Sequence, residues 1–103
     1  MQTIKLQPVP NQTASMLAAG QLAGINLYTM SDGNLYIDIL LNNVEILTGV
    51  LCLDRTLIVR AAYFGFIGDF IFVDTQGNND PQFSELGARY QFNYVSASDL
   101  ATL

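Results

Sequence analysis

The chain has 103 residues and a formal net charge of −5; half of its residues are hydrophobic and only 13% are charged. This length allows one domain with one modest core, and the four bases form no stripe, which disfavours binding to a phosphate backbone. Because the charged fraction is about half the usual value, we expect part of the surface to be buried against another chain. The alternative is a monomer covered by Asn, Gln, Ser and Thr.

Residues 12–19 form the first predicted element. Their alanines, methionine and leucine favour a helix by propensity, but the segment is short, and Gly20 and Gly24 follow it. Because the neighbouring segments have the pattern of β-strands, we predict a strand here, with a helix as the alternative.

Two hairpins are predicted next. An Asp-Gly pair within residues 31–34 suits the positive φ angles of a tight turn, so residues 25–30 and 35–41 are expected to pair as antiparallel strands. The Asn-Asn pair at 42–43 tolerates left-handed geometry and leads into a further strand at 44–53.

The second half of the chain is predicted to hold three more strands and a tail. Residues 56–62 begin with a continuous apolar run, which favours a central strand buried on both faces, and residues 70–74 follow two glycines. The last strand is predicted over residues 88–95. Residues 98–103 are expected to form one helical turn capped by Ser98, or a tail.

Alternation of side chains supports this assignment. In the last strand Tyr90, Phe92 and Tyr94 share one face and polar residues the other, which is the period of two expected for a half-buried strand. About seven short strands joined by tight hairpins predict an all-β protein, namely one compact antiparallel β-barrel or sandwich over residues 1–97. Its core is expected to contain the last-strand aromatics and five phenylalanines: Phe64, Phe66, Phe70, Phe72 and Phe83.

Most catalytic chemistries lack their residues in this sequence. There is no histidine, and Cys52 is the single cysteine, within an apolar run where a buried and inert thiol is expected. No phosphate-binding motif is present. Six carboxylates remain as candidates for a glycosidase-like pair, but their spacing singles out no two: Asp38, Asp54, Asp69, Asp74, Asp80 and Glu85. We therefore expect no enzymatic activity, no cofactor and no metal.

The loop at residues 74–80 superficially suggests a calcium site, because oxygen-bearing side chains surround a glycine. It lacks the EF-hand spacing and the closing bidentate glutamate. The same composition is needed for a simple turn, which is the interpretation that we prefer. We also expect no signal peptide and no membrane span, because the first residues contain no apolar segment and no apolar run is long enough.

An ordered series of short motifs resembles the phage baseplate plug family and covers nearly the whole chain. The motifs are Pro10-Asn11-Gln12, residues 33–38 (Gly-Asn-Leu-Tyr-Ile-Asp), residues 46–49 (Ile-Leu-Thr-Gly), residues 66–74 (Phe-Ile-Gly-Asp-Phe-Ile-Phe-Val-Asp), Gly77, Asp80-Pro81, residues 86–90 (Leu-Gly-Ala-Arg-Tyr) and Tyr94. Each motif is short, so the resemblance depends on their order.

The resemblance implies a structural protein of a contractile phage tail, located in the baseplate of the virion at the central hub or plug region, near the tube and spike. Its partners would be the hub, tail tube and spike proteins and copies of itself, with no nucleic acid and no membrane, and the host cytoplasm would hold it before assembly. The family motifs supply six candidate residues for fold or interface: Asp74, Gly77, Asp80, Pro81, Gly87 and Arg89. Two alternatives stay open: a small OB-like β-barrel that binds carbohydrate or single-stranded nucleic acid, and a carboxylate-only cell-wall hydrolase.

Overall fold

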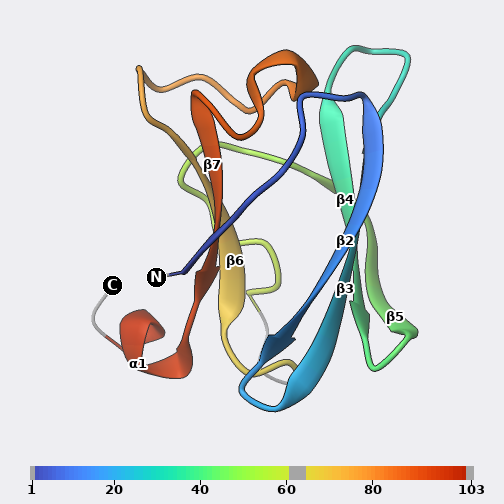
Figure 1. The fold of residues 1–103 in the computed structure, drawn as a ribbon, viewed down its shortest axis with the longest axis vertical. Helices are drawn as coiled ribbons and strands as arrows, with labels where there is room; N and C mark the ends of the chain where they lie inside the picture. Colours follow the sequence, from blue (N-terminus) through green and yellow to red (C-terminus); the bar gives the residue numbers. More distant parts are fainter. Residues whose placement is uncertain (1, 61–64, 102–103) are drawn as a thin grey trace.

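The computed structural model describes residues 2–60 and 65–101. Within them, seven strands form two antiparallel sheets that pack face to face (Figure 1). One sheet has the strand order β2-β3-β4-β5 and the other the order β1-β7-β6. Over these residues no strand ladder joins the two sheets, so the predicted all-β fold is a sandwich and not a closed barrel.

The four-stranded sheet is a series of hairpins. Its strands are β2 (Asn11–Ala18), β3 (Gln21–Thr29), β4 (Leu35–Leu41) and β5 (Val44–Leu51). Gly33 has a φ of +81°, and Asn42 and Asn43 have φ values of +50° and +67°. Tight hairpin turns require such positive angles. Both predicted hairpins are therefore confirmed, and residues 12–18 form a strand rather than a helix.

The three-stranded sheet contains β1 (Gln2–Ile4), β6 (Asp69–Asp74) and β7 (Tyr90–Val95). Strand β1 was not predicted, because three residues are too few for an alternating pattern. The connections of this sheet also differ from the predicted tight hairpins. The chain crosses between sheets after β1 and after β5, and residues 75–89, with the 3₁₀ turn η2 (Phe83–Glu85), join β6 to β7.

The central strand predicted at residues 56–62 is wrong for residues 56–60; residues 61 and 62 lie outside the described part. Leu57 makes an isolated bridge to Ile71, and the N–H of Ile58 donates to the carbonyl of Phe70 at 3.1 Å. The ladder does not extend, because the carboxylate of Asp69 shares the N–H of Ile58 and takes those of Val59 and Arg60, and Arg60 has a φ of +57°. Ile58 and Val59 are nevertheless buried, as expected.

The core lies between the two sheets and is aromatic on one side. Phe70 stacks on Phe66 and Phe92, with ring centroids 5.2 and 5.1 Å apart, and Phe72 lies 4.7 Å from Phe92. The opposing sheet supplies aliphatic side chains, Ile25, Leu27, Ile37 and Ile39 among them. The expected packing role of these aromatics is confirmed; Phe64 lies outside the described residues.

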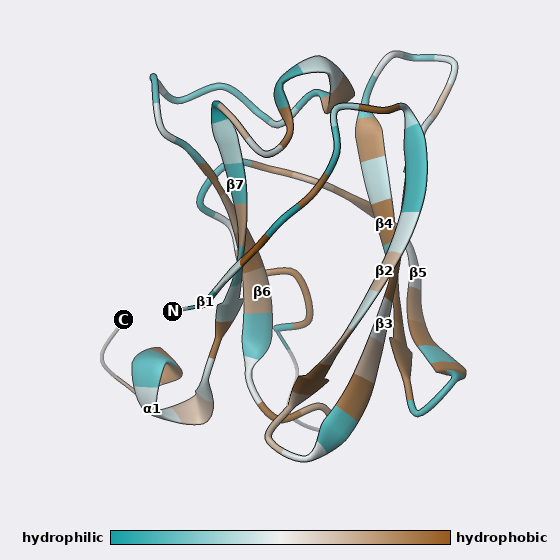
Figure 2. Ribbon diagram, viewed as in Figure 1, coloured by the Kyte–Doolittle hydropathy of each residue, from teal (hydrophilic) through white to brown (hydrophobic). Residues whose placement is uncertain are grey.

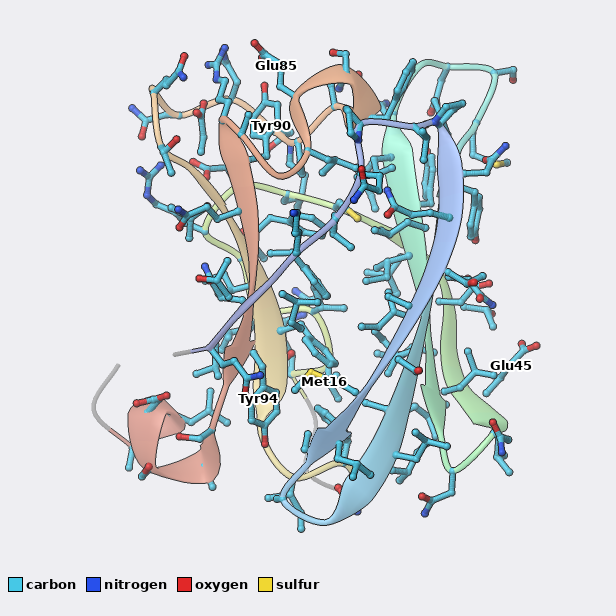
Figure 3. The ribbon with its side chains drawn as sticks, viewed as in Figure 1. Met16, Glu45, Glu85, Tyr90 and Tyr94 are labelled. Atoms are coloured by element: carbon cyan, nitrogen blue, oxygen red, sulfur yellow. The ribbon has the colours of Figure 1, made fainter. Side chains whose placement is uncertain are left out.

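Side-chain directions follow the two layers. Figure 3 shows Met16 pointing into the space between the sheets, whereas Glu45 points away from it. Figure 2 shows the same division as alternating hydropathy along the strands. This arrangement is the expected consequence of the period of two along each strand.

The described part of the chain ends in the short helix α1 (Ala97–Leu100). Its N-cap is Ser96, whose hydroxyl accepts the N–H of Asp99 at 3.2 Å, so the predicted cap at Ser98 is wrong by two residues. Ser98 shares the cap residue's chemistry, but it already lies within the first turn. No helix within residues 2–60 and 65–101 has the length and apolar character needed to cross a membrane.

Candidate functional site

All six candidate residues lie at one end of the three-stranded sheet, where β6 ends and β7 begins, and five of them lie in the connecting loop. Asp74, the last residue of β6, is buried. Arg89, next to the start of β7, donates from Nε to its Oδ1 and from Nη2 to its Oδ2, each at 2.8 Å. The N–H groups of Gln76 and Asn79 add two hydrogen bonds of 2.9 Å. These donors, with the guanidinium foremost, hold the pKa of Asp74 well below its usual range.

The rest of the loop closes around this pair. A Cβ on Gly77 would lie 3.4 Å from both Asp74 Oδ2 and Arg89 Nη2, so the backbone of this residue passes directly beside the ion pair. Asp80 accepts the N–H of Asp54 at 2.9 Å, and Pro81 is fully buried.

The loop therefore has the hydrogen bonding of a turn. Both oxygens of Asp74 already accept protein N–H groups. Across residues 2–60 and 65–101, no group of three His, Cys, Asp or Glu side chains has an arrangement that would hold a metal ion.

Asp54 and Arg55 clamp the same loop from the segment that follows β5. Arg55 donates to the carbonyls of Asp74 and Gly77, each at 3.0 Å, and to Oδ1 of Asn78 at 2.9 Å. Asp54 accepts the N–H of Asp74 at 2.8 Å. In the sequence these two residues lie between the predicted strands at 44–53 and 56–62. Arg55 gives the break between them through its left-handed φ of +53°, but nothing in the local pattern reveals a partner this far along the chain.

Residues 74–89, together with Asp54 and Arg55, form a loop cluster at this end of the sheet. Gly87 fixes the segment that leads from β1 to β2 against this loop cluster. Its φ is +81°, and a Cβ at this position would lie 2.4 Å from the carbonyl oxygen of Leu6. Its N–H donates to the carbonyl of Tyr90 at 3.1 Å. Both the backbone angle and the close approach require glycine here.

Asp69 is a second buried carboxylate, at the other end of β6. Its Oδ1 accepts the N–H groups of Ile58, Val59 and Phe70 at 3.1, 2.7 and 2.6 Å, and its Oδ2 accepts the N–H of Arg60 at 2.8 Å. In the sequence, Asp69 stands out only as one of the six candidate carboxylates and as a member of the motif at residues 66–74. A signal was present, because an aspartate beside an apolar strand has to be surrounded by donors.

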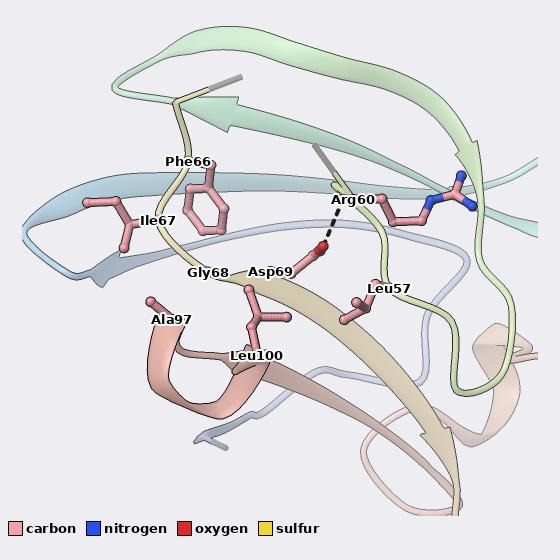
Figure 4. Close-up of a pocket in the computed structure, with 8 residues that line it drawn as sticks. All are labelled: Leu57, Arg60, Phe66, Ile67, Gly68, Asp69, Ala97 and Leu100. Carbon is pink, nitrogen blue, oxygen red and sulfur yellow. Dashed lines mark hydrogen bonds between the residues drawn. The ribbon is translucent and has the colours of Figure 1, made fainter. Parts of the chain in front are cut away.

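A cavity of about 450 Å³ lies beside this carboxylate. Figure 4 shows its lining, in which Leu57, Phe66, Ile67 and Leu100 present apolar side chains and Asp69 turns towards the backbone of Arg60. The cavity thus offers apolar surface, while the oxygens of its carboxylate are already occupied by N–H donors.

Two further chemistry-bearing residues, Cys52 and Asp38, are also engaged within the fold. Cys52 is buried, and burial raises the pKa of its thiol. Asp38 accepts the hydroxyl of Tyr28 and the N–H of Gly49, each at 2.8 Å. In the described part of the chain, the buried carboxylates therefore hold loops and strand ends in place.

The comparisons with known proteins agree with the resemblance seen in the sequence. No curated protein shows significant similarity to the chain. The family model described as "Cyanophage baseplate Pam3 plug gp18" matches residues 1–97. The expected family is thereby confirmed: the chain belongs to this family of phage baseplate plug proteins.

Proposed function

We propose that the protein is a non-enzymatic structural plug that packs at the central hub of a contractile-tail baseplate, near the tail tube and spike. Its partners are the hub, tube and spike proteins and further copies of itself. It is made in the host cytoplasm and functions in the virion. The six candidate residues serve this role indirectly, by holding the loops at one end of the three-stranded sheet.

One observation carries the proposal: two carboxylates are buried and hydrogen-bonded within the fold, while large apolar side chains remain exposed. The carboxylates of Asp69 and Asp74 each accept four protein N–H groups. Among residues 2–60 and 65–101, seven large apolar side chains are exposed: Val9, Leu17, Met30, Val44, Leu51, Leu53 and Ile67. A surface with few charges and many exposed apolar groups favours contact with other proteins.

The binding-module alternative is less well supported. Single strands and sugars are held on exposed aromatic rings, but Phe66, Phe70, Phe72, Phe92 and Tyr94 are buried between the sheets. The cell-wall hydrolase needs two carboxylates facing a substrate. Two of the six candidate carboxylates, Asp69 and Asp74, are instead buried and bonded within the fold.

Co-expression with the hub, tail-tube and spike proteins of the same phage tests the proposal. The tagged protein is expected to retain at least one of them on an affinity column, whereas an unrelated β-sandwich of similar size and charge retains none. Retention of none, together with a lytic band on a peptidoglycan gel or tight binding of single-stranded DNA at low salt, would replace this function with one of the alternatives.

A further inference from the structure

The edges of the two sheets differ in how they are protected against further strand pairing. An edge strand with free N–H and C=O groups is a template for another chain, and proteins protect it by shortness, cover, bulges or charge. Strand β1 has three residues. The free side of β6 is covered, because Arg55 donates its N–H to Phe72 and Ile58 donates to Phe70. Both edges of the three-stranded sheet are thus protected.

The two edges of the four-stranded sheet are unlike each other. Strand β5 contains the exposed Glu45, its pairing with β4 shifts register, and Gly49 has a φ of +65°. Strand β2 has eight residues and pairs with β3 in one unbroken register from Asn11 to Ala18. It contains no charge, no proline and no bulge. Among the described edges, β2 is therefore the one that lacks all of these protections.

The stretch of chain around β2 is also free of charge. Residues 6–31 include no Asp, Glu, Lys or Arg. Three exposed apolar side chains lie in this stretch, Val9, Leu17 and Met30, and Leu17 is 74% exposed. Figure 2 shows β2 passing from hydrophilic at its start to hydrophobic at its end. A second copy of the chain can therefore pair with this edge through its own β2 without burying a charged side chain of either strand.

We propose that β2 is a self-association edge, at which β2 of a second copy adds antiparallel and joins the two four-stranded sheets into one. Antiparallel pairing of identical strands is self-complementary, because each contact occurs twice. The outward side chains Thr13, Ser15 and Leu17 share a face. In the register centred on Ser15, Leu17 of one copy lies opposite Thr13 of the other, which covers exposed apolar surface.

The acidic strands of the same sheet argue against other self-contacts. Asp38 and Glu45 lie on β4 and β5, and no base occurs between Lys5 and Arg55. Two copies that met through β5 or through the outer face would therefore bring like charges together, which is unfavourable. This interface deepens the proposed structural role and rests on it only for its place in the baseplate.

A charge placed on β2 tests the interface. In light scattering, the apparent mass of the wild-type protein is expected to rise with concentration, from the monomer mass of 11.3 kDa towards twice that value. Ser15→Lys and Ser15→Glu are each expected to remain monomeric, because like charges then face each other near the two-fold axis. An equimolar mixture of the two variants restores association. The matched control is Thr48→Lys on β5, an exposed position of the opposite edge, which leaves association unchanged.

Three results would each overturn the inference: a wild-type protein that stays monomeric, a Ser15→Lys variant that still associates, or a mixture that fails to recover. Thermal unfolding of each variant excludes misfolding as the cause. The hub, tube and spike retention experiment is repeated with Ser15→Lys. Retention of a baseplate protein by a monomeric wild type would leave the structural role standing without this interface.

Discussion

Asp74 and Arg89 form a two-pronged ion pair that joins the end of β6 to the residue before β7, with two N–H···O bonds of 2.8 Å. The two residues are 15 positions apart and are separated by the whole loop that shapes this end of the sandwich. Since the carboxylate is buried and accepts two further N–H groups, its charge contributes to the stability of the fold.

The pH dependence of stability is expected to reveal the contribution of this ion pair to the free energy of unfolding. The pKa of Asp74 is lowered in the folded protein, so the pair stabilises the fold above the unfolded value of about 3.9 and loses its effect as pH falls through the folded value. Arg89→Gln should lower the thermal midpoint at pH 7, and the difference from wild type should shrink below about pH 4. Glu85→Gln, which removes an exposed acid 3.5 Å from Arg89, serves as control. A difference that is constant from pH 7 to pH 2 would contradict this role.

Asp69→Asn is expected to destabilise the protein, because one amide N–H₂ would face the N–H of Arg60 where Oδ2 now accepts it. Leaving a buried donor unsatisfied costs about 1–3 kcal/mol. Urea unfolding measures the loss, and hydrogen exchange should show earlier opening at Ile58, Val59 and Arg60. Asp32→Asn is the matched control, since Asp32 is exposed and an asparagine can still accept the N–H of Asn34. Equal effects of both substitutions would refute a special role for the buried carboxylate.

A comparison of Gly87→Ala with Gly33→Ala separates the cost of backbone strain from the cost of a steric clash. Both glycines have a φ of +81°. Each substitution therefore carries the left-handed penalty of about 1–2 kcal/mol. Only at Gly87 would the new methyl group lie 2.4 Å from the carbonyl oxygen of Leu6, whereas nothing lies within 4 Å at Gly33. Chemical unfolding should therefore show the larger loss for Gly87→Ala. Similar losses would mean that the segment around Leu6 moves aside freely.

The thiol of Cys52 is expected to be unreactive in the folded protein. It is buried, and burial raises its pKa, so little thiolate forms at pH 8. A disulfide reagent that changes absorbance on reaction should give no signal until urea unfolds the protein. Ser84→Cys in a Cys52→Ser background gives an exposed comparison that reacts at once. Rapid modification of native Cys52 would show that the core opens far more often than its packing suggests.

Short-range patterns predicted much of the four-stranded sheet. Asp-Gly and Asn-Asn fixed the two hairpin turns because their backbone angles depend on neighbouring atoms. Alternation along β7 predicted that Tyr90, Phe92 and Tyr94 face the core, and all three are buried. Propensity left residues 12–19 between helix and strand. Pairing with β3 makes this segment a strand, since the pairing provides hydrogen-bond partners for backbone N–H and C=O groups of β2 along eight residues.

The loop cluster was predictable only in part. The family motifs include Asp74 and Arg89 as candidates, but no local pattern indicates that Asp54, Arg55 and Asp69 hold loops. Each of them bonds to groups roughly 10 to 20 or more positions away, and a local sequence window contains no record of such contacts. The failed strand at residues 56–60 has the same origin, because the carboxylate of Asp69 takes the N–H groups that a ladder needs.

The sequence by itself determined the all-β class, the hairpins and the family. Those features depend on residue type and on local backbone geometry. Only the tertiary structure decided between sandwich and barrel. It also places Asp69 and Asp74 in the interior among N–H donors, and it leaves β2 as the unprotected edge. These features depend on which distant segments meet, and that is set by how the two sheets close over one shared core.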